Sequence, residues 1–149
     1  MRALAPLAAF ALAAVSVQAQ PQRSAAPQQT LAVADAAVSV EVQAGGADRN
    51  AVPGSGCSGF IANRRPSAAV EVTGEGPLSI YAVSGTDTTL LVSDPAGRWH
   101  CSDDANGSNP AVTFADARAG VYTVWVGTFS PEAAPAAAQL HAVRGRPRW

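Results

Sequence analysis

The chain has 149 residues, of which 48% are hydrophobic and 14% charged, and its formal net charge is −1 at pH 7. This length allows one ordinary domain and little more. All its basic side chains are arginines, and they lack the clustered excess typical of nucleic-acid-binding proteins, so we expect no nucleic-acid partner.

The N-terminal residues 1–19 have the order of segments found in a secretory signal peptide. Arg2 supplies a positive charge, residues 7–17 form an apolar run broken only by Ser16, and Val17-Gln18-Ala19 offers small residues at the cleavage positions. A membrane-spanning helix needs about 20 apolar residues, which this run does not reach. We therefore predict cleavage near Ala19 and a mature protein without a membrane span, in the periplasm or the extracellular medium. The alternative is an uncleaved N-terminal anchor.

Short strand candidates follow a polar lead-in. Residues 20–37 are rich in alanine, glutamine and proline, which predicts a flexible segment. Val38, Val40 and Val42 alternate with polar residues, a pattern typical of a half-buried strand, and mark the start of the folded domain. Glycine, proline and aspartate turns separate the later candidates. These are residues 59–62, 70–72, 78–83, 88–93, 98–101, 112–114, 121–128 and 139–143.

The spacing of about eight or nine short strands, with no convincing helix, predicts an all-β fold. We expect a small antiparallel β-sandwich or barrel over residues 38–143. Residues 144–149 contain Arg144, Arg146 and Arg148 and are expected to form a solvated, frayed basic tail.

Strand alternation predicts which side chains face the core. The core-facing residues are Val70, Val72, Leu78, Ile80, Leu90, Val92, Val112, Phe114, Tyr122, Val124 and Val126. Trp99 shares a strand face with Cys101, where an indole ring can pack beside a disulfide. Trp125 alternates with the core-facing residues of its strand and therefore points away from the main core. We predict Trp125 as a candidate ligand-binding residue on a surface for peptide or glycan; the alternative is a partly covered structural tryptophan.

The two cysteines, Cys57 and Cys101, predict a disulfide, because the compartment of an exported chain is oxidising and an even cysteine count there indicates pairing. The bond would close a loop of about 45 residues and stabilise the fold by roughly 4 kcal/mol in the loop-entropy model. A zinc site is disfavoured, since the two histidines are distant and close ligand pairs are missing. A free thiol pair is the weaker alternative.

Acidic and amide side chains in the polar loop 102–110 suggest a calcium site. The candidate ligands are Asp103, Asp104 and Asn106 with Asp87, and Asp94 could add to them if the neighbouring loops converge. Calcium takes six to eight oxygen ligands, which such a loop can offer. The alternative is a structural turn, because Asp and Asn side chains hydrogen-bond to their own backbone in turns. We predict no other cofactor.

A catalytic function is disfavoured by the shortage of chemical groups. His100 and His141 are the only imidazole bases, and the chain has no Gly-x-Ser-x-Gly nucleophile turn. We therefore predict that the protein is not an enzyme.

Residues 85–128 carry an ordered set of motifs. An aspartate opens the strand Asp87-Thr88-Thr89-Leu90-Leu91-Val92, and the turn Asp94-Pro95-Ala96-Gly97 follows. A polar loop then leads to a strand in which Gly120, Tyr122, Val124 and Val126 alternate. In this order the stretch resembles the bacterial pre-peptidase C-terminal domain family, small secreted modules often attached to secreted peptidases. The resemblance implies a jelly-roll-like β-sandwich.

These observations together predict an exported, non-catalytic β-sandwich module that binds a protein, peptide or glycan, or that serves as an accessory domain. Two alternatives remain open. One is a secreted peptidase-related hydrolase or its remnant. The other is a structural envelope protein without a soluble ligand.

Overall fold

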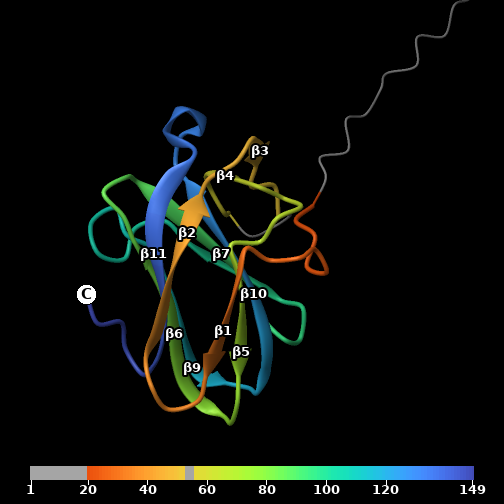
Figure 1. Ribbon diagram of the computed structural model, residues 1–149, viewed down its shortest axis with the longest axis vertical. Helices are drawn as coiled ribbons and strands as arrows, with labels where there is room; N and C mark the ends of the chain where they lie inside the picture. The colour runs from red at the N-terminus through yellow and green to blue at the C-terminus, as the bar shows by residue number, and fades with distance from the viewer. Residues whose placement is uncertain (1–19, 53–55) are drawn as a thin grey trace, which may run out of the picture.

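A computed structural model describes residues 20–52 and 56–149, and the predicted signal peptide lies outside them. The described chain is an all-β fold of eleven strands and one short 3-10 turn, Pro131–Ala133, arranged in two packed sheets (Figure 1). The predicted fold class, a β-sandwich, is confirmed, although the strand count exceeds the eight or nine expected. No helix in this part of the chain is long and apolar enough to cross a membrane.

Sheet A has seven strands, and the long strand β10 lies at its centre. Its order is β1-β5-β10, with β7 and then β8 on the other side of β10. The short strand β4 pairs with the C-terminal end of β10, and β3 pairs with β4. The strands are β1 (Gln29–Val33), β3 (Asp48–Arg49), β4 (Phe60–Ile61), β5 (Ala68–Val72), β7 (Thr88–Ser93), β8 (Trp99–Ser102) and β10 (Gly120–Thr128).

Sheet B has four antiparallel strands in the order β2-β11-β6-β9. The strands are β2 (Val38–Ala44), β6 (Gly76–Val83), β9 (Ala111–Ala117) and β11 (Ala136–Arg144). Strand β11 begins three residues before the predicted 139–143, because Ala136–Ala138 pair with β2 despite their low intrinsic strand preference.

The main core lies between the two sheets and matches the predicted alternation. Ten of the eleven predicted core residues are buried, and the eleventh, Phe114, is partly buried against the same cluster. Apolar burial of this kind is the main force holding the sheets together.

The prediction of a flexible lead-in is wrong over residues 29–33. These residues form β1, which pairs in parallel with β5, and Leu31 and Val33 are buried in the main core. Upstream of β1, the Gln22 amide donates to the Asn63 carbonyl oxygen at 2.8 Å. The alternation of Leu31 and Val33 covers too few residues to predict a strand by itself, and the strand depends on its pairing with β5.

The tail also differs from the frayed end that was predicted. Arg144 belongs to β11, and its guanidinium donates to the carbonyl oxygens of Ala34 and Thr73. Residues 145–149 fold back onto sheet B, where the Trp149 ring contacts Tyr81. The tail is therefore docked on the domain.

Candidate functional site

The predicted disulfide is present. The Cys57 and Cys101 sulfur atoms are bonded, with a Cα–Cα distance of 5.7 Å. The bond ties β8, the edge strand of sheet A, to the segment that precedes β4. This covalent link fits a protein that matures in an oxidising compartment.

Trp125 is not the surface residue that was predicted. It does point to the outer face of sheet A, but only 1% of it is exposed, because a second small core covers that face. Its ring centroid lies 5.6 Å from that of Trp99, and it packs with Ile61 and Leu91. The guanidinium of Arg23 lies over the Trp99 ring at 4.3 Å. The prediction of Trp125 as a ligand-binding residue is therefore corrected: it is a buried structural tryptophan.

The residues predicted to hold calcium do not form a cluster. Asp103 accepts hydrogen bonds from the Ser58 hydroxyl at 2.9 Å and from the Asp104 amide at 3.1 Å. The backbones of Asn106 and Asn109 pair with each other and close the loop as a turn. Across residues 20–52 and 56–149, no group of three or more His, Cys, Asp or Glu side chains could hold a metal ion. With Asp87 exposed on a separate loop, the geometry favours the turn alternative.

Asp94, which could have added to the calcium ligands, instead makes four hydrogen bonds within its own hairpin. Its Oδ1 accepts the backbone amides of Ala96 and Arg98, both at 2.9 Å. Its Oδ2 faces Arg98 Nε at 2.8 Å and His100 Nε2 at 3.0 Å. Burial by itself raises the pKa of the Asp94 carboxyl, but the hydrogen bonds from His100 and Arg98 outweigh burial and hold the pKa below its ordinary value.

The sequence pattern predicts the turn around Asp94 but not this network. The Asp-Pro-Ala-Gly pattern predicted a β-turn, and the Gly97 amide indeed donates to the Asp94 carbonyl oxygen at 2.8 Å. His100 reaches the carboxylate because β7 and β8 pair as a hairpin, with Ser93 opposite Trp99. An aspartate at the first position of such a turn is the one signal that could have marked the site.

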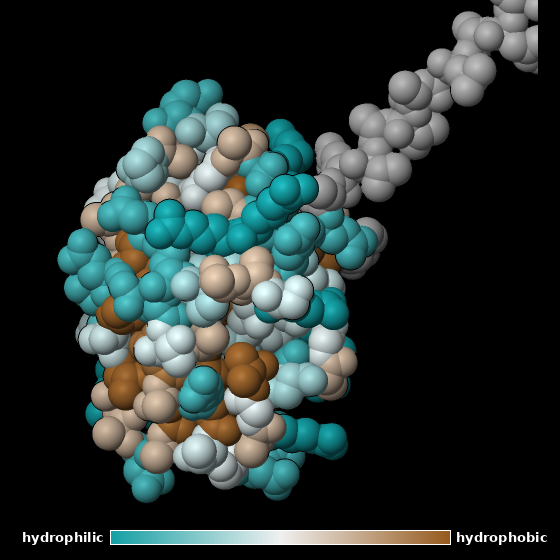
Figure 2. Space-filling model, turned by 45° about the vertical axis from the view of Figure 1, so that its right-hand side comes forward, coloured by the Kyte–Doolittle hydropathy of each residue, from teal (hydrophilic) through white to brown (hydrophobic). Residues whose placement is uncertain are grey.

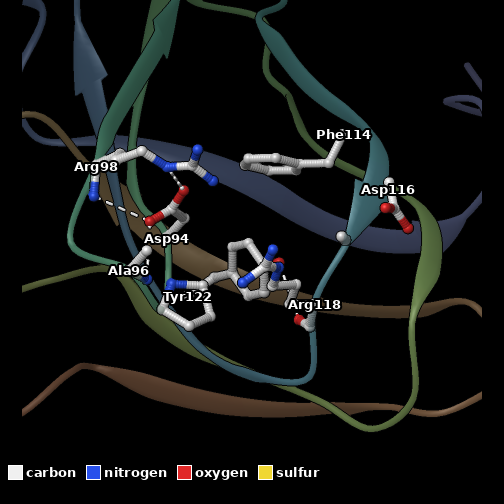
Figure 3. Close-up of a pocket in the computed structure, with 9 residues that line it drawn as sticks. Asp94, Ala96, Arg98, Phe114, Asp116, Arg118 and Tyr122 are labelled. Atoms are coloured by element: carbon white, nitrogen blue, oxygen red, sulfur yellow. Dashed lines mark hydrogen bonds and ion pairs between the residues drawn. The ribbon is translucent and has the colours of Figure 1, made fainter.

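A small hollow lies beside Asp94, at one end of the sandwich. The Asp94–Arg98 pair lies on one side and Phe114 and Asp116 lie on the other, with Arg118 also at its rim (Figure 3). Its volume of about 30 Å³ suits one or two water molecules rather than an organic ligand. The two arginines are matched by two aspartates, so the hollow carries no excess charge that would attract an ion.

Aromatic rings close the hollow from inside. The Phe114 ring lies 4.8 Å from His100 and 5.1 Å from Tyr122, in edge-on geometry with both. The Tyr122 hydroxyl donates to the Arg118 carbonyl oxygen at 3.0 Å, and burial raises the pKa of that phenol. The cluster therefore seals the gap between the β8 and β9 edges and has a structural role.

The two imidazoles lie in different sheets. The His100 ring hydrogen-bonds to Asp94, whereas His141 stacks on Tyr81 with ring centroids 4.7 Å apart. Burial lowers the pKa of His141. Within the described residues, no serine or threonine hydroxyl hydrogen-bonds to either ring, so His100 and Asp94 form a pair without a nucleophile.

These features define a disulfide-linked all-β sandwich with a buried ionic turn at one end. Among solved structures, the chain is similar to the pre-peptidase C-terminal domain of collagenase from Bacillus anthracis. The similarity covers 81% of this chain and 98% of that chain, with a TM-score of 0.50 and 13% sequence identity. No protein-family model and no curated protein sequence matches the chain. The resemblance detected at residues 85–128 is thus confirmed at the level of the fold.

Proposed function

We propose that the protein is an exported, non-catalytic accessory module that binds a protein, peptide or glycan. The observation that carries the proposal is the fold that this chain shares with the pre-peptidase C-terminal domain of a collagenase. The signal-like segment in residues 1–19 and the Cys57–Cys101 bond support export.

The chemistry of the ionisable groups agrees with a binding role. The Asp94 carboxylate hydrogen-bonds to His100, but it also accepts three hydrogen bonds from its own turn, and no serine or threonine hydroxyl of the described residues hydrogen-bonds to the imidazole. His141 is half-buried against Tyr81. The groups that a hydrolase would use are thus engaged in holding the fold.

Apolar side chains on the surface offer contacts for a ligand. They gather on the lower half of one face of the sandwich (Figure 2). Val83, Val121, Phe129 and Trp149 are each more than one third exposed. Exposed apolar groups of this size contribute to binding when a partner covers them.

The test is to present the intact, biotinylated mature protein to peptide and glycan arrays. We expect saturable binding to one ligand class, and loss of that binding when the protein is reduced and alkylated. Binding to none would favour the structural envelope alternative. A serine-reactive fluorophosphonate probe tests the hydrolase alternative in parallel, and stoichiometric labelling would overturn the non-catalytic assignment.

A further inference from the structure

Two polar side chains on the outer face of sheet B are buried. Strand β6 directs Leu78, Ile80 and Ala82 into the core, so Ser79 and Tyr81 point outward. Outward residues of an antiparallel sheet normally face solvent. Yet Ser79 is 0% and Tyr81 only 1% exposed. Another segment of the chain must therefore cover this part of the sheet.

The cover is the chain's own segment 145–149, which we call the tail segment. After β11 the chain reverses at Gly145, whose φ of 86° favours glycine, and the C-terminal end runs back beside sheet B (Figure 1). Ser79 Oγ donates to the Gly145 carbonyl oxygen at 2.6 Å, and Tyr81 Oη donates to the Arg148 carbonyl oxygen at 3.0 Å. The Trp149 ring then packs edge-on against Tyr81, with centroids 4.9 Å apart.

The receiving surface is held in shape from the sheet side. His141, on the neighbouring strand β11, stacks on Tyr81 at an angle of 6°, and Thr113 on β9 lies 3.0 Å from Ser79, hydroxyl to hydroxyl. Side chains in contact across three paired strands thus form one continuous surface, which we call the Tyr81 surface: Ser79, Tyr81, Thr113 and His141.

The contacts on the tail segment show what the Tyr81 surface recognises. The side-chain hydrogen bonds from Ser79 and Tyr81 both end on main-chain carbonyl oxygens, and the Gly145 amide donates to the Pro77 carbonyl oxygen at 3.2 Å, so all three use main-chain groups that a peptide offers. Arg146 and Arg148 are exposed, and Trp149 is the residue of the tail segment whose ring packs against Tyr81. Main-chain hydrogen bonds with one side-chain anchor are a common way to bind an extended peptide.

We propose that the Tyr81 surface is a binding site for an extended peptide with an aromatic residue, and that the tail segment occupies this site in cis. The inference rests on the proposed binding function and deepens it by naming the surface and the ligand class. In the five-residue tail segment, the carbonyl oxygens of the first and fourth residues accept hydrogen bonds and the fifth residue is aromatic, and we expect a bound peptide to have the same pattern. A partner peptide must displace the tail segment, whose attachment to β11 gives it an effective concentration on the order of millimolar.

The anchor of the tail limits how much of it can move. The Arg144 guanidinium is fixed on the carbonyl oxygens of Ala34, Thr73 and Gly74, so release would begin after this residue. Trp149, by contrast, is 50% exposed. Exchange therefore requires the segment after Arg144 to leave the Tyr81 surface, without opening the sandwich.

The test uses the full chain and a fluorescein-labelled peptide, Gly-Arg-Pro-Arg-Trp, with binding followed by fluorescence anisotropy. Trp149→Ala weakens the tethered competitor, so this variant should bind the peptide about ten-fold more tightly than the unmodified chain. Adding Tyr81→Phe to Trp149→Ala keeps the ring but removes the hydroxyl donor, and should weaken binding about five-fold. Arg146→Ala, at an exposed position of the same segment, is the matched control and should bind like the unmodified chain.

A second readout locates the peptide. The NMR signals of the His141 ring should shift on addition of the peptide to the Trp149→Ala chain, and Gly-Arg-Pro-Arg-Ala should shift them much less. Equal affinity for the unmodified and Trp149→Ala chains, or no binding to either, would overturn the inference. If the arrays still reveal a ligand for the unmodified chain, the proposed function survives that outcome; if they reveal none, both fail.

Discussion

The buried carboxylate of Asp94 makes a quantitative prediction about stability. Asp94→Ala removes every acceptor at once and leaves the amides of Ala96 and Arg98 and the ring of His100 without their partner. A hydrogen bond to a charged group contributes about 1.5–3 kcal/mol, and a buried donor left without a partner costs about 1–3 kcal/mol. Because these contributions overlap, we expect a loss of about 3 kcal/mol in the free energy of unfolding.

Asp94→Asn separates the two oxygens of the carboxylate. An asparagine can keep one carbonyl oxygen for the two backbone amides, but its NH₂ group then faces Arg98 Nε and His100 Nε2. Arg98 is largely exposed and its ion pair contributes little, so the loss falls mainly on the bond to His100. We expect a cost of about 1.5 kcal/mol, roughly half that of the alanine variant. Asp116→Asn, on the rim of the same hollow, is the control and should change stability by less than about 0.5 kcal/mol.

The pH dependence of the same variants provides an independent check. The pKa of Asp94 is lowered in the folded protein, so folding favours its charged form. The stability it contributes is complete above the unfolded-state pKa of about 3.9 and is lost as the pH falls through the folded-state pKa. The gap between the unmodified protein and Asp94→Asn should therefore be constant near pH 5 and narrow below about pH 4.

Urea unfolding followed by circular dichroism measures all three variants at pH 5 and pH 3. The reasoning about Asp94 would be refuted if Asp94→Ala were no less stable than Asp116→Asn. It would also fail if the gap between the unmodified protein and Asp94→Asn widened on acidification.

Four further predictions concern the disulfide, the two cores and the polar loop. Replacing Cys57 and Cys101 together by serine should lower the free energy of unfolding by about 4 kcal/mol in urea titrations, and an unchanged midpoint would contradict the loop-closure argument. Trp125→Ala should lower the free energy of unfolding by about 3–5 kcal/mol by leaving a cavity in the second core, whereas a mild effect would contradict the burial of Trp125. Leu31→Ala should cost about 2–3 kcal/mol by calorimetry if β1 is ordered, and near-neutral behaviour would restore the flexible lead-in. Millimolar calcium should leave the melting temperature unchanged, and a clear rise would revive the calcium site.

Local patterns in the sequence were enough to predict the sandwich core and the disulfide. Alternation places Leu90 and Val92 inward because a strand has a period of two, whatever its partner. The pairing of Cys57 with Cys101 followed from the count of cysteines and the expected compartment. That residues 29–33 form the strand β1, in contrast, depends on their pairing with β5. Each residue of β1 pairs with a residue 39 positions further along the chain, so a local pattern could not reveal this strand.

The candidate site was harder to predict because its partners come from different elements. Asp94 was visible as a turn residue, but its bond to His100 depends on the register of the β7–β8 hairpin. The acidic loop had more carboxylates, yet its side chains satisfy neighbouring backbone and hydroxyl groups, as Asp103 does with Ser58. Composition thus favoured the loop 102–110 as the candidate site, whereas burial and hydrogen-bond geometry favour the turn that begins at Asp94.

Alternation also fails to predict exposure on the outer faces of the two sheets, and the reason bears on function. On sheet A, Trp125 is covered by a segment that the Cys57–Cys101 bond fixes covalently. On sheet B, Tyr81 is covered by the tail segment, which is held by hydrogen bonds and the contact of Trp149. Non-covalent contacts can exchange with those of a ligand, whereas a disulfide keeps its segment in place. If one covered face of this sandwich opens to a peptide, it is therefore the face of Tyr81.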